Sequence, residues 1–124
     1  MEKYTRKELV DALKVVSSTI NNCEKAQLKF AEGTSQHTLL KNRLKALYVS
    51  KALIIGEDTM DIYTKEELIE ALTPVSSIIS KCEKAKLKFE EGTSHHTRLK
   101  NMINAMYISK SLIADEINKR DSKI

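Results

Sequence analysis

An internal duplication constrains this chain more than any other feature of its sequence. Residues 4–54 and 63–113 are two copies of one unit, offset by 59 residues, and 32 of the 51 aligned positions are identical. Such self-similarity is typical of a repeated supersecondary unit that buries its apolar face against its neighbour. The sequence therefore predicts two copies of one small motif, joined by a linker, residues 55–62. A polar tail, residues 114–124, follows them, and we expect it to fray.

The composition is that of a globular helical protein. The 124 residues are 41 % hydrophobic and 31 % charged, which allows a core and excludes wholesale disorder. Only three glycines and one proline argue against a loop-rich or many-stranded fold. No apolar run approaches the ~20 residues of a membrane span, and the N-terminal residues lack an apolar signal segment. We therefore expect a cytoplasmic protein.

The two cysteines, Cys23 and Cys82, occupy equivalent positions in the two copies. They form no CxxC pair and no Cys/His cluster at metal-binding spacing. Both fall on an apolar helical stripe, where cysteine behaves as a small hydrophobic residue. We expect buried, unpaired thiols, and we expect no metal and no cofactor.

Each copy is predicted to begin with a long helix. Thr5-x-x-Glu8 and Thr64-x-x-Glu67 are capping boxes, which mark helix N-termini. Apolar residues then recur at alternating spacings of four and three, which predicts a helix of about 26 residues with one buried stripe. In copy one this stripe contains Leu9, Leu13, Val16, Ile20, Cys23 and Phe30.

The single proline, Pro74, replaces Val15 about ten residues into the first helix of copy two. Proline lacks the N–H group that an interior helical residue donates. Thr73-Pro74 also has the form of an N-cap followed by a first-turn proline. A kink or a break is therefore expected at this point of the second copy.

Glycine and hydroxyl residues mark the turn to a second helix in each copy. Gly33 and Gly92 stand where a left-handed C-terminal cap is expected, and Thr34 and Thr93, with the serines that follow them, supply N-caps. The stripe of the second helix in copy one contains His37, Leu40, Leu44, Leu47, Lys51 and Ile54. So short a connection forces the helices antiparallel. The sequence predicts an all-α fold in which two helical hairpins form a four-helix bundle with pseudo-twofold symmetry.

Acidic residues are missing from the second helix of each hairpin. None occurs between Glu32 and Glu57 or between Glu91 and Asp115, and copy one carries a net charge of +5 against +2 for copy two. A basic stretch is usually a solvated face. A soluble helix, however, normally alternates its charges to gain i,i+4 pairs. The loss of every carboxylate in both copies favours an anionic ligand.

The segment GTSxHTxxKN stands at the start of this acid-free helix and is our candidate site. A helix N-terminus offers free N–H donors and a partial positive charge, which hydroxyls and a lysine would complete as a phosphate cradle. It is not a P-loop, because the residue order differs and no strand precedes it. The candidate ligand-binding residues are Thr34, Ser35, His37, Thr38, Lys41, Asn42 and Tyr48 in copy one, and Thr93, Ser94, His96, Thr97, Lys100, Asn101 and Tyr107 in copy two.

Imidazole, ammonium and phenol groups are expected to form a row beside the core stripe. At 100° per residue, His37, Lys41 and Tyr48 lie within about 40° of one another. A base could stack on the tyrosine while phosphates meet the donors at the helix end. Lys86, which replaces Gln27 on the stripe near the hairpin loop, is added to the candidates, because a charge there is costly unless it is paired or faces a ligand.

Each of these residues also has an interpretation without a ligand. Thr34 or Ser35 can be a helix cap, and a histidine at the edge of a stripe is more often a core residue than a ligand. Tyr48 fits the core with its hydroxyl in water, and Lys41 can shield the apolar stripe with its stem. The convergence of these groups on one acid-free helix end favours binding.

Catalysis is not predicted. No histidine has a carboxylate partner nearby in sequence, and no pairing of a nucleophile with a base is visible. No pair of carboxylates stands where a cleft is expected. The Arg-then-His spacing of the helical HEPN ribonucleases is also absent from this sequence.

The leading hypothesis is a non-catalytic binder of a nucleotide or another phosphorylated metabolite. In size, helicity and the phosphate-binding character of its GTSxHTxxKN segments, the chain resembles the small nucleotide-sequestering "sponge" proteins of phages, of the anti-CBASS and anti-Thoeris type. That resemblance implies the capture of a cyclic nucleotide or ADP-ribose-type signal in the host cytoplasm. Because a four-helix bundle offers little concave volume, we also expect a homo-oligomer.

Two other functions remain open. The acid-free helices could face an acidic protein, as in an antitoxin or adaptor module. A net charge of +4 and a pI of 9.0 also permit nucleic-acid binding, although only six aromatic residues, four Tyr and two Phe, are available for stacking.

Overall fold

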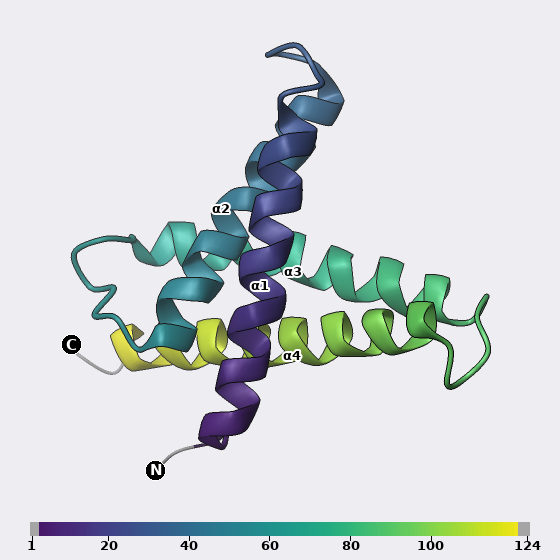
Figure 1. The fold of residues 1–124 in the computed structure, drawn as a ribbon. Coiled ribbons are helices and arrows are strands. Elements are labelled where there is room, and N and C mark those ends of the chain that lie inside the picture. The colour runs from purple at the N-terminus through teal and green to yellow at the C-terminus, as the bar shows by residue number, and fades with distance from the viewer. Residues whose placement is uncertain (1–2, 122–124) are drawn as a thin grey trace.

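The computed structural model describes residues 3–121, which form four α-helices and no strand (Figure 1). The helices are α1 (Arg6–Gln27), α2 (Ser35–Ile55), α3 (Lys65–Lys86) and α4 (Ser94–Asp121). α1 and α2 pack as one antiparallel hairpin, and α3 and α4 pack as the other. The predicted all-α fold with four helices is confirmed.

The two hairpins cross steeply, and each projects a tip beyond the crossing (Figure 1). We call residues 28–42 the first tip and residues 87–101 the second tip. α2 contacts both helices of the second hairpin and α4 contacts both helices of the first, whereas α1 and α3 do not touch within residues 3–121. This pattern is the one that a twofold axis between α2 and α4 would produce, and the pseudo-twofold symmetry itself stays a prediction.

The core lies at the crossing and draws on all four helices. Its largest completely buried apolar side chains are Val16, Leu47, Leu68, Val75, Met106 and Ile113. Ser50 and Ser109 are also completely buried, and each hydroxyl donates to the carbonyl one turn earlier, at 2.8 Å. Within the described residues, these are the only hydroxyls that the helices bury completely. Because both are hydrogen-bonded, their burial costs little folding free energy.

The first helix of each hairpin begins at its capping box, as predicted. The Thr5 hydroxyl accepts from the Glu8 N–H at 3.1 Å, and the Glu8 carboxylate accepts from the Thr5 N–H at 2.9 Å. Thr64 and Glu67 repeat this exchange at 3.1 and 2.8 Å. Two N–H groups at each helix start are therefore satisfied reciprocally.

These first helices end earlier than the stripe predicts. α1 stops at Gln27, and the chain then makes short turns in which the Lys29 and Phe30 N–H groups donate to the carbonyls three residues earlier. The predicted placement of Phe30 on the helical stripe is wrong, and its side chain is exposed. Gly33 has the expected left-handed backbone, with φ of +93°, but it precedes the N-cap Thr34 instead of capping α1.

Pro74 lies inside α3, which runs from Lys65 to Lys86 without a break. Of the two expected outcomes, a kink or a break, the break is therefore wrong, and the kink stays a prediction. Ala71 before the proline and Val75 after it are both buried in the core, so packing on both sides of Pro74 holds the helix together there. Because Pro74 has no N–H, the Glu70 carbonyl does not receive its ordinary i+4 hydrogen bond.

The polar tail is helical as far as Asp121, because Arg120 anchors it. The Arg120 guanidinium donates to the Tyr63 carbonyl at 2.5 Å, to the Thr59 carbonyl at 2.7 Å and to Glu116 at 3.1 Å. The expected fraying is wrong for residues 114–121, and residues 122–124 lie outside the described part. The arginine holds the linker against the end of α4.

Both cysteines carry free thiols, with Cys23 buried and Cys82 half-buried. Burial raises the pKa of both thiols, which keeps them protonated near neutral pH. None of the helices within residues 3–121 is long and apolar enough to cross a membrane.

Candidate functional site

The tips carry the GTSxHTxxKN segments, and their threonines are helix caps. The Thr34 hydroxyl accepts from the His37 N–H at 3.2 Å and donates to the Ala31 carbonyl at 2.8 Å. Thr93 makes the same two bonds with His96 and Glu90, at 3.2 and 2.8 Å. These contacts give each threonine a structural role at the helix start, as in the interpretation without a ligand.

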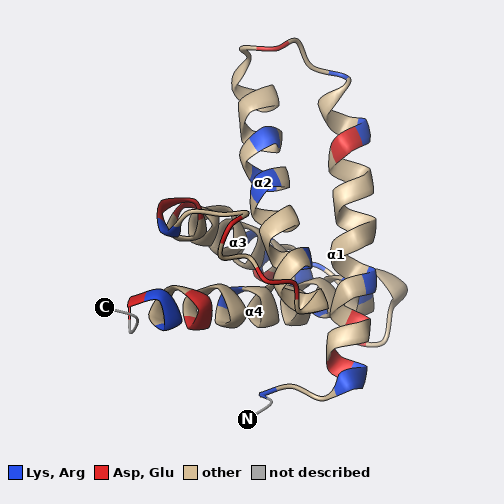
Figure 2. Ribbon diagram, turned by 90° about the vertical axis from the view of Figure 1, so that its left-hand side faces the viewer, with Lys and Arg blue, Asp and Glu red and all other residues tan. Residues whose placement is uncertain are grey.

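The lysines one turn further along are free to bind. Lys41 and Lys100 are exposed and make no ion pair or hydrogen bond within residues 3–121. Thr38 and Thr97 are exposed beside them, whereas His37 and His96 are half-buried. Figure 2 shows Lys and Arg, and no Asp or Glu, along α2. Each tip thus presents a cation above an acid-free helix start.

The two candidate segments do not converge. The first tip lies at the far end of the first hairpin and the second tip at the far end of the second, pointing in different directions (Figure 1). A ligand bound at one tip of a chain is therefore remote from the other tip. The candidate residues therefore fall into two separate groups in each chain.

Each predicted row is also divided along its helix. Tyr48 and Asn42 on α2 line one groove near the crossing, and Tyr107 and Asn101 on α4 line another. Neither groove is lined by the histidines at the helix starts, His37 and His96. The Tyr48 hydroxyl donates to Glu24 on α1, and the Tyr107 hydroxyl donates to Glu83 on α3 at 3.4 Å. The hydrogen bond to Glu24, followed by burial, raises the pKa of Tyr48.

Two grooves flank the crossing. The sequence analysis named some of their residues but did not predict the grooves. One lies between α2 and α3 with a volume of about 450 Å³, and the other lies between α1 and α4 with about 660 Å³. Each is lined by eleven residues, and every residue of one groove corresponds to a residue of the other at an offset of 59. All four tyrosines of the chain line these grooves: Tyr48 and Tyr63 in the α2–α3 groove, and Tyr4 and Tyr107 in the α1–α4 groove.

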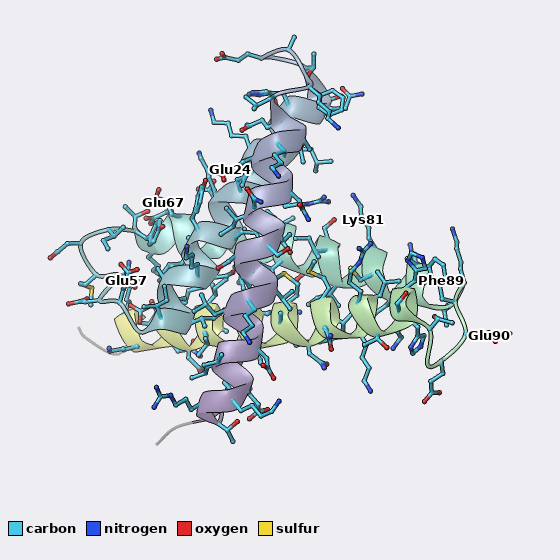
Figure 3. All side chains as sticks on the ribbon, viewed as in Figure 1. Glu24, Glu57, Glu67, Lys81, Phe89 and Glu90 are labelled. Carbon is cyan, nitrogen blue, oxygen red and sulfur yellow. The ribbon has the colours of Figure 1, made fainter. Side chains whose placement is uncertain are left out.

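The α2–α3 groove has an acidic surround. Glu67 and Glu70 line its α3 wall, and Lys45 is the single cation in the lining. Burial, followed by the charges of Glu57 and Glu67, raises the pKa of Tyr63. Glu24, Glu57 and Glu67 lie on one side of α1 in Figure 3. A phosphate is disfavoured in such a place, so the hairpin tips and the tyrosines are chemically distinct regions.

The second tip differs from the first by an aromatic contact that the sequence analysis also missed. The Phe89 and His95 rings stack with centroids 5.0 Å apart, whereas Gln36 occupies the equivalent position in copy one. Lys86 lies half-buried at the end of α3 and makes no ion pair within the described part of the chain. Over residues 28–42 and 87–101 the net charges are equal, because the extra cation of the second segment, Arg98, is offset by its extra carboxylate, Glu90.

No group of three or more His, Cys, Asp or Glu side chains within residues 3–121 is placed to hold a metal ion. Comparisons with protein-family models, with curated proteins and with solved structures found no match to this chain.

Proposed function

We propose that this protein is a non-catalytic binding protein for an anionic, phosphorylated small molecule, held at the hairpin tips. The observation that carries this proposal is the pair of exposed, unpaired lysines, Lys41 and Lys100, each one turn into a helix whose first half contains no carboxylate. Free N–H groups at a helix start and a nearby ammonium complement a phosphate in both charge and hydrogen bonding.

The energetics require more than one tip per ligand. A helix terminus contributes at most about 2 kcal/mol to the binding of an anion. Sequestration at nanomolar concentrations needs about 12 kcal/mol. Since the two tips of one chain point apart, we propose that a tip of a second copy closes over the ligand. A nucleotide signal enclosed in this homo-oligomer would be withheld from its receptor, which is the role that the sponge proteins suggest.

A ligand screen by thermal unfolding tests the proposal. Nucleotides, cyclic dinucleotides and ADP-ribose are added in turn, and a ligand at a thousandfold excess over its dissociation constant should stabilise the fold by about 4 kcal/mol. The double substitution Lys41→Ala with Lys100→Ala should abolish that stabilisation. The matched control, Lys110→Ala with Lys119→Ala, removes the same charge from exposed positions of α4 outside the tips and should leave the stabilisation intact.

A second candidate function, docking onto an acidic protein, is favoured by one specific observation. Leu28 and Leu87, at equivalent positions of the two tips, are 88 % and 85 % exposed. Exposed apolar side chains with lysines beside them fit a protein interface with an acidic partner. In that case Leu28→Ser with Leu87→Ser would abolish partner binding, and the double lysine substitution would only weaken it.

A further inference from the structure

We infer that the α2–α3 groove is a second binding site, for a small organic cation that carries primary ammonium groups, as alkyl diamines and polyamines do. This site is independent of the anion site at the tips. Its volume of about 450 Å³ falls within the range of small-ligand sites.

Two aromatic rings from different repeats line the groove. Tyr48 comes from α2, and Tyr63 comes from the segment just before α3. The faces of such rings attract ammonium groups. The Tyr48 hydroxyl donates its hydrogen bond to Glu24. Its oxygen can therefore still accept a hydrogen bond from a ligand.

The α3 wall supplies acceptors that the protein itself does not use. Glu70 makes no ion pair or hydrogen bond through its side chain within residues 3–121. Only one Glu67 oxygen serves the capping box, which leaves the other available. Pro74 lines the same wall, and because it lacks an N–H the Glu70 backbone carbonyl is a further acceptor there.

The α1–α4 groove is the natural control, because it has the same plan, with the capping-box Glu8 in the place of Glu67, and differs at the positions of Glu70 and Pro74. Its Asp11, the counterpart of Glu70, is ion-paired with Lys7 at 2.9 Å, and Lys14 also lies in its lining. Val15 stands there in place of the proline. At the position of Lys7 the second repeat has Glu66, so the charge around the α2–α3 groove is more negative.

The four tyrosines make the site measurable without a label. The chain has no tryptophan, and all its tyrosines line the two grooves, so intrinsic tyrosine fluorescence reports on these places alone. Spermidine, 1,4-diaminobutane and butylamine are titrated at constant ionic strength, with magnesium chloride as the non-organic cation. We expect a saturable change with spermidine and diaminobutane, and a weaker affinity for butylamine, because one ammonium cannot use two acceptors.

Matched variants in the two grooves decide the assignment. Glu70→Gln should weaken spermidine binding about tenfold, the loss expected for one hydrogen bond to a charged group. Asp11→Asn, its counterpart, should change the affinity by less than about twofold, since the α1–α4 groove is not the site. Pro74→Val, which restores the residue type of the first repeat and the helical N–H, should weaken binding without unfolding α3, as checked by circular dichroism.

Two results would overturn the inference. The first is a fluorescence signal that does not saturate below about 10 mM spermidine, which lies outside even weak specific binding. The second is an equal loss of affinity in Glu70→Gln and Asp11→Asn, which would reveal a general attraction of the cation to negative charge. Neither result bears on the tips, whose lysines remain untouched in these variants.

Discussion

Leucine has opposite environments in two regions of this molecule. At the crossing of the hairpins, Leu47 and Leu68 are completely buried, whereas at the tips Leu28 and Leu87 are almost fully exposed. The same helices lead to both regions, and both repeats show the same contrast. The comparison teaches that packing energy is concentrated where the hairpins cross. The tips are held by backbone turns and caps, and their side chains are left free for contacts with other molecules.

The largest expected effect comes from leucine substitutions in the two regions. Leu68→Ala removes a completely buried side chain and should lower the free energy of unfolding by about 4 kcal/mol, because it leaves a cavity. Leu87→Ala at the second tip should change it by less than about 0.5 kcal/mol. Urea denaturation of both variants measures the difference. Equal losses of unfolding free energy in the two variants would show that the tips contribute as much to stability as the core does.

Arg120→Ala tests whether the linker belongs to the crossing. The Arg120 and Glu116 side chains are only 9 % and 13 % exposed, so the substitution leaves a buried carboxylate and two carbonyls without their partner. A loss of about 3 kcal/mol in unfolding free energy is expected. Lys119→Ala, at the exposed neighbouring position, is the control. If both variants unfold at the same urea concentration, the arginine does not anchor the linker.

Helix caps sharpen the comparison at a smaller scale. Thr64→Ala removes the cap of α3 and should cost about 1 kcal/mol of global stability. Thr93→Ala removes an equivalent cap at the second tip. There we expect mainly local opening, seen as faster amide hydrogen exchange in residues 92–97, with a smaller change in the global unfolding free energy. If Thr93→Ala lowers the global unfolding free energy as much as Thr64→Ala does, the tips are not less important for stability than the crossing, and the comparison fails.

The smallest effect is the response of stability to alkaline pH. The pKa of Tyr48 and the pKa of Tyr63 are both raised in the folded protein, so the folded state holds these protons more tightly than the unfolded state does. Their contribution to stability is complete below the ordinary tyrosine pKa of about 10 and falls as the pH rises through the folded pKa. Tyr48→Phe should flatten the fall of the melting temperature between about pH 9 and 11. An unchanged slope would show that the hydrogen bond to Glu24 does not matter.

Local signals in the sequence predicted local structure well. Thr5 and Thr64 begin their helices because capping depends on residues three apart, and Thr34 begins α2 for the same reason. Phe30 was misplaced because it continues the apolar spacing after the backbone has left the helix. Pro74 did not break α3, because packing on both sides outweighs one lost hydrogen bond.

Features that join distant residues could not be predicted in this way. The crossing of the hairpins follows from how their surfaces fit, which the stripes do not specify. The grooves could not be predicted, since Tyr4 and Tyr107 come to line one groove only through the crossing of the hairpins. Arg120 had no counterpart to point to it, because it lies in the tail beyond the repeats, and the residue 59 positions earlier is Asp61 of the linker. The unpaired Lys41 and Lys100 could be anticipated from the sequence, because no carboxylate follows Glu32 or Glu91 for more than twenty residues.

The most direct test of the central claim is native mass spectrometry of the protein purified gently from the cells that express it. The account predicts an oligomer of the 14.1 kDa chain that retains a small molecule, with a mass that identifies a phosphorylated compound. The variant with both Lys41→Ala and Lys100→Ala should be purified without that compound. A bare monomer, together with the absence of any thermal shift across the nucleotide panel, would contradict ligand sequestration at the tips and favour docking onto a protein partner.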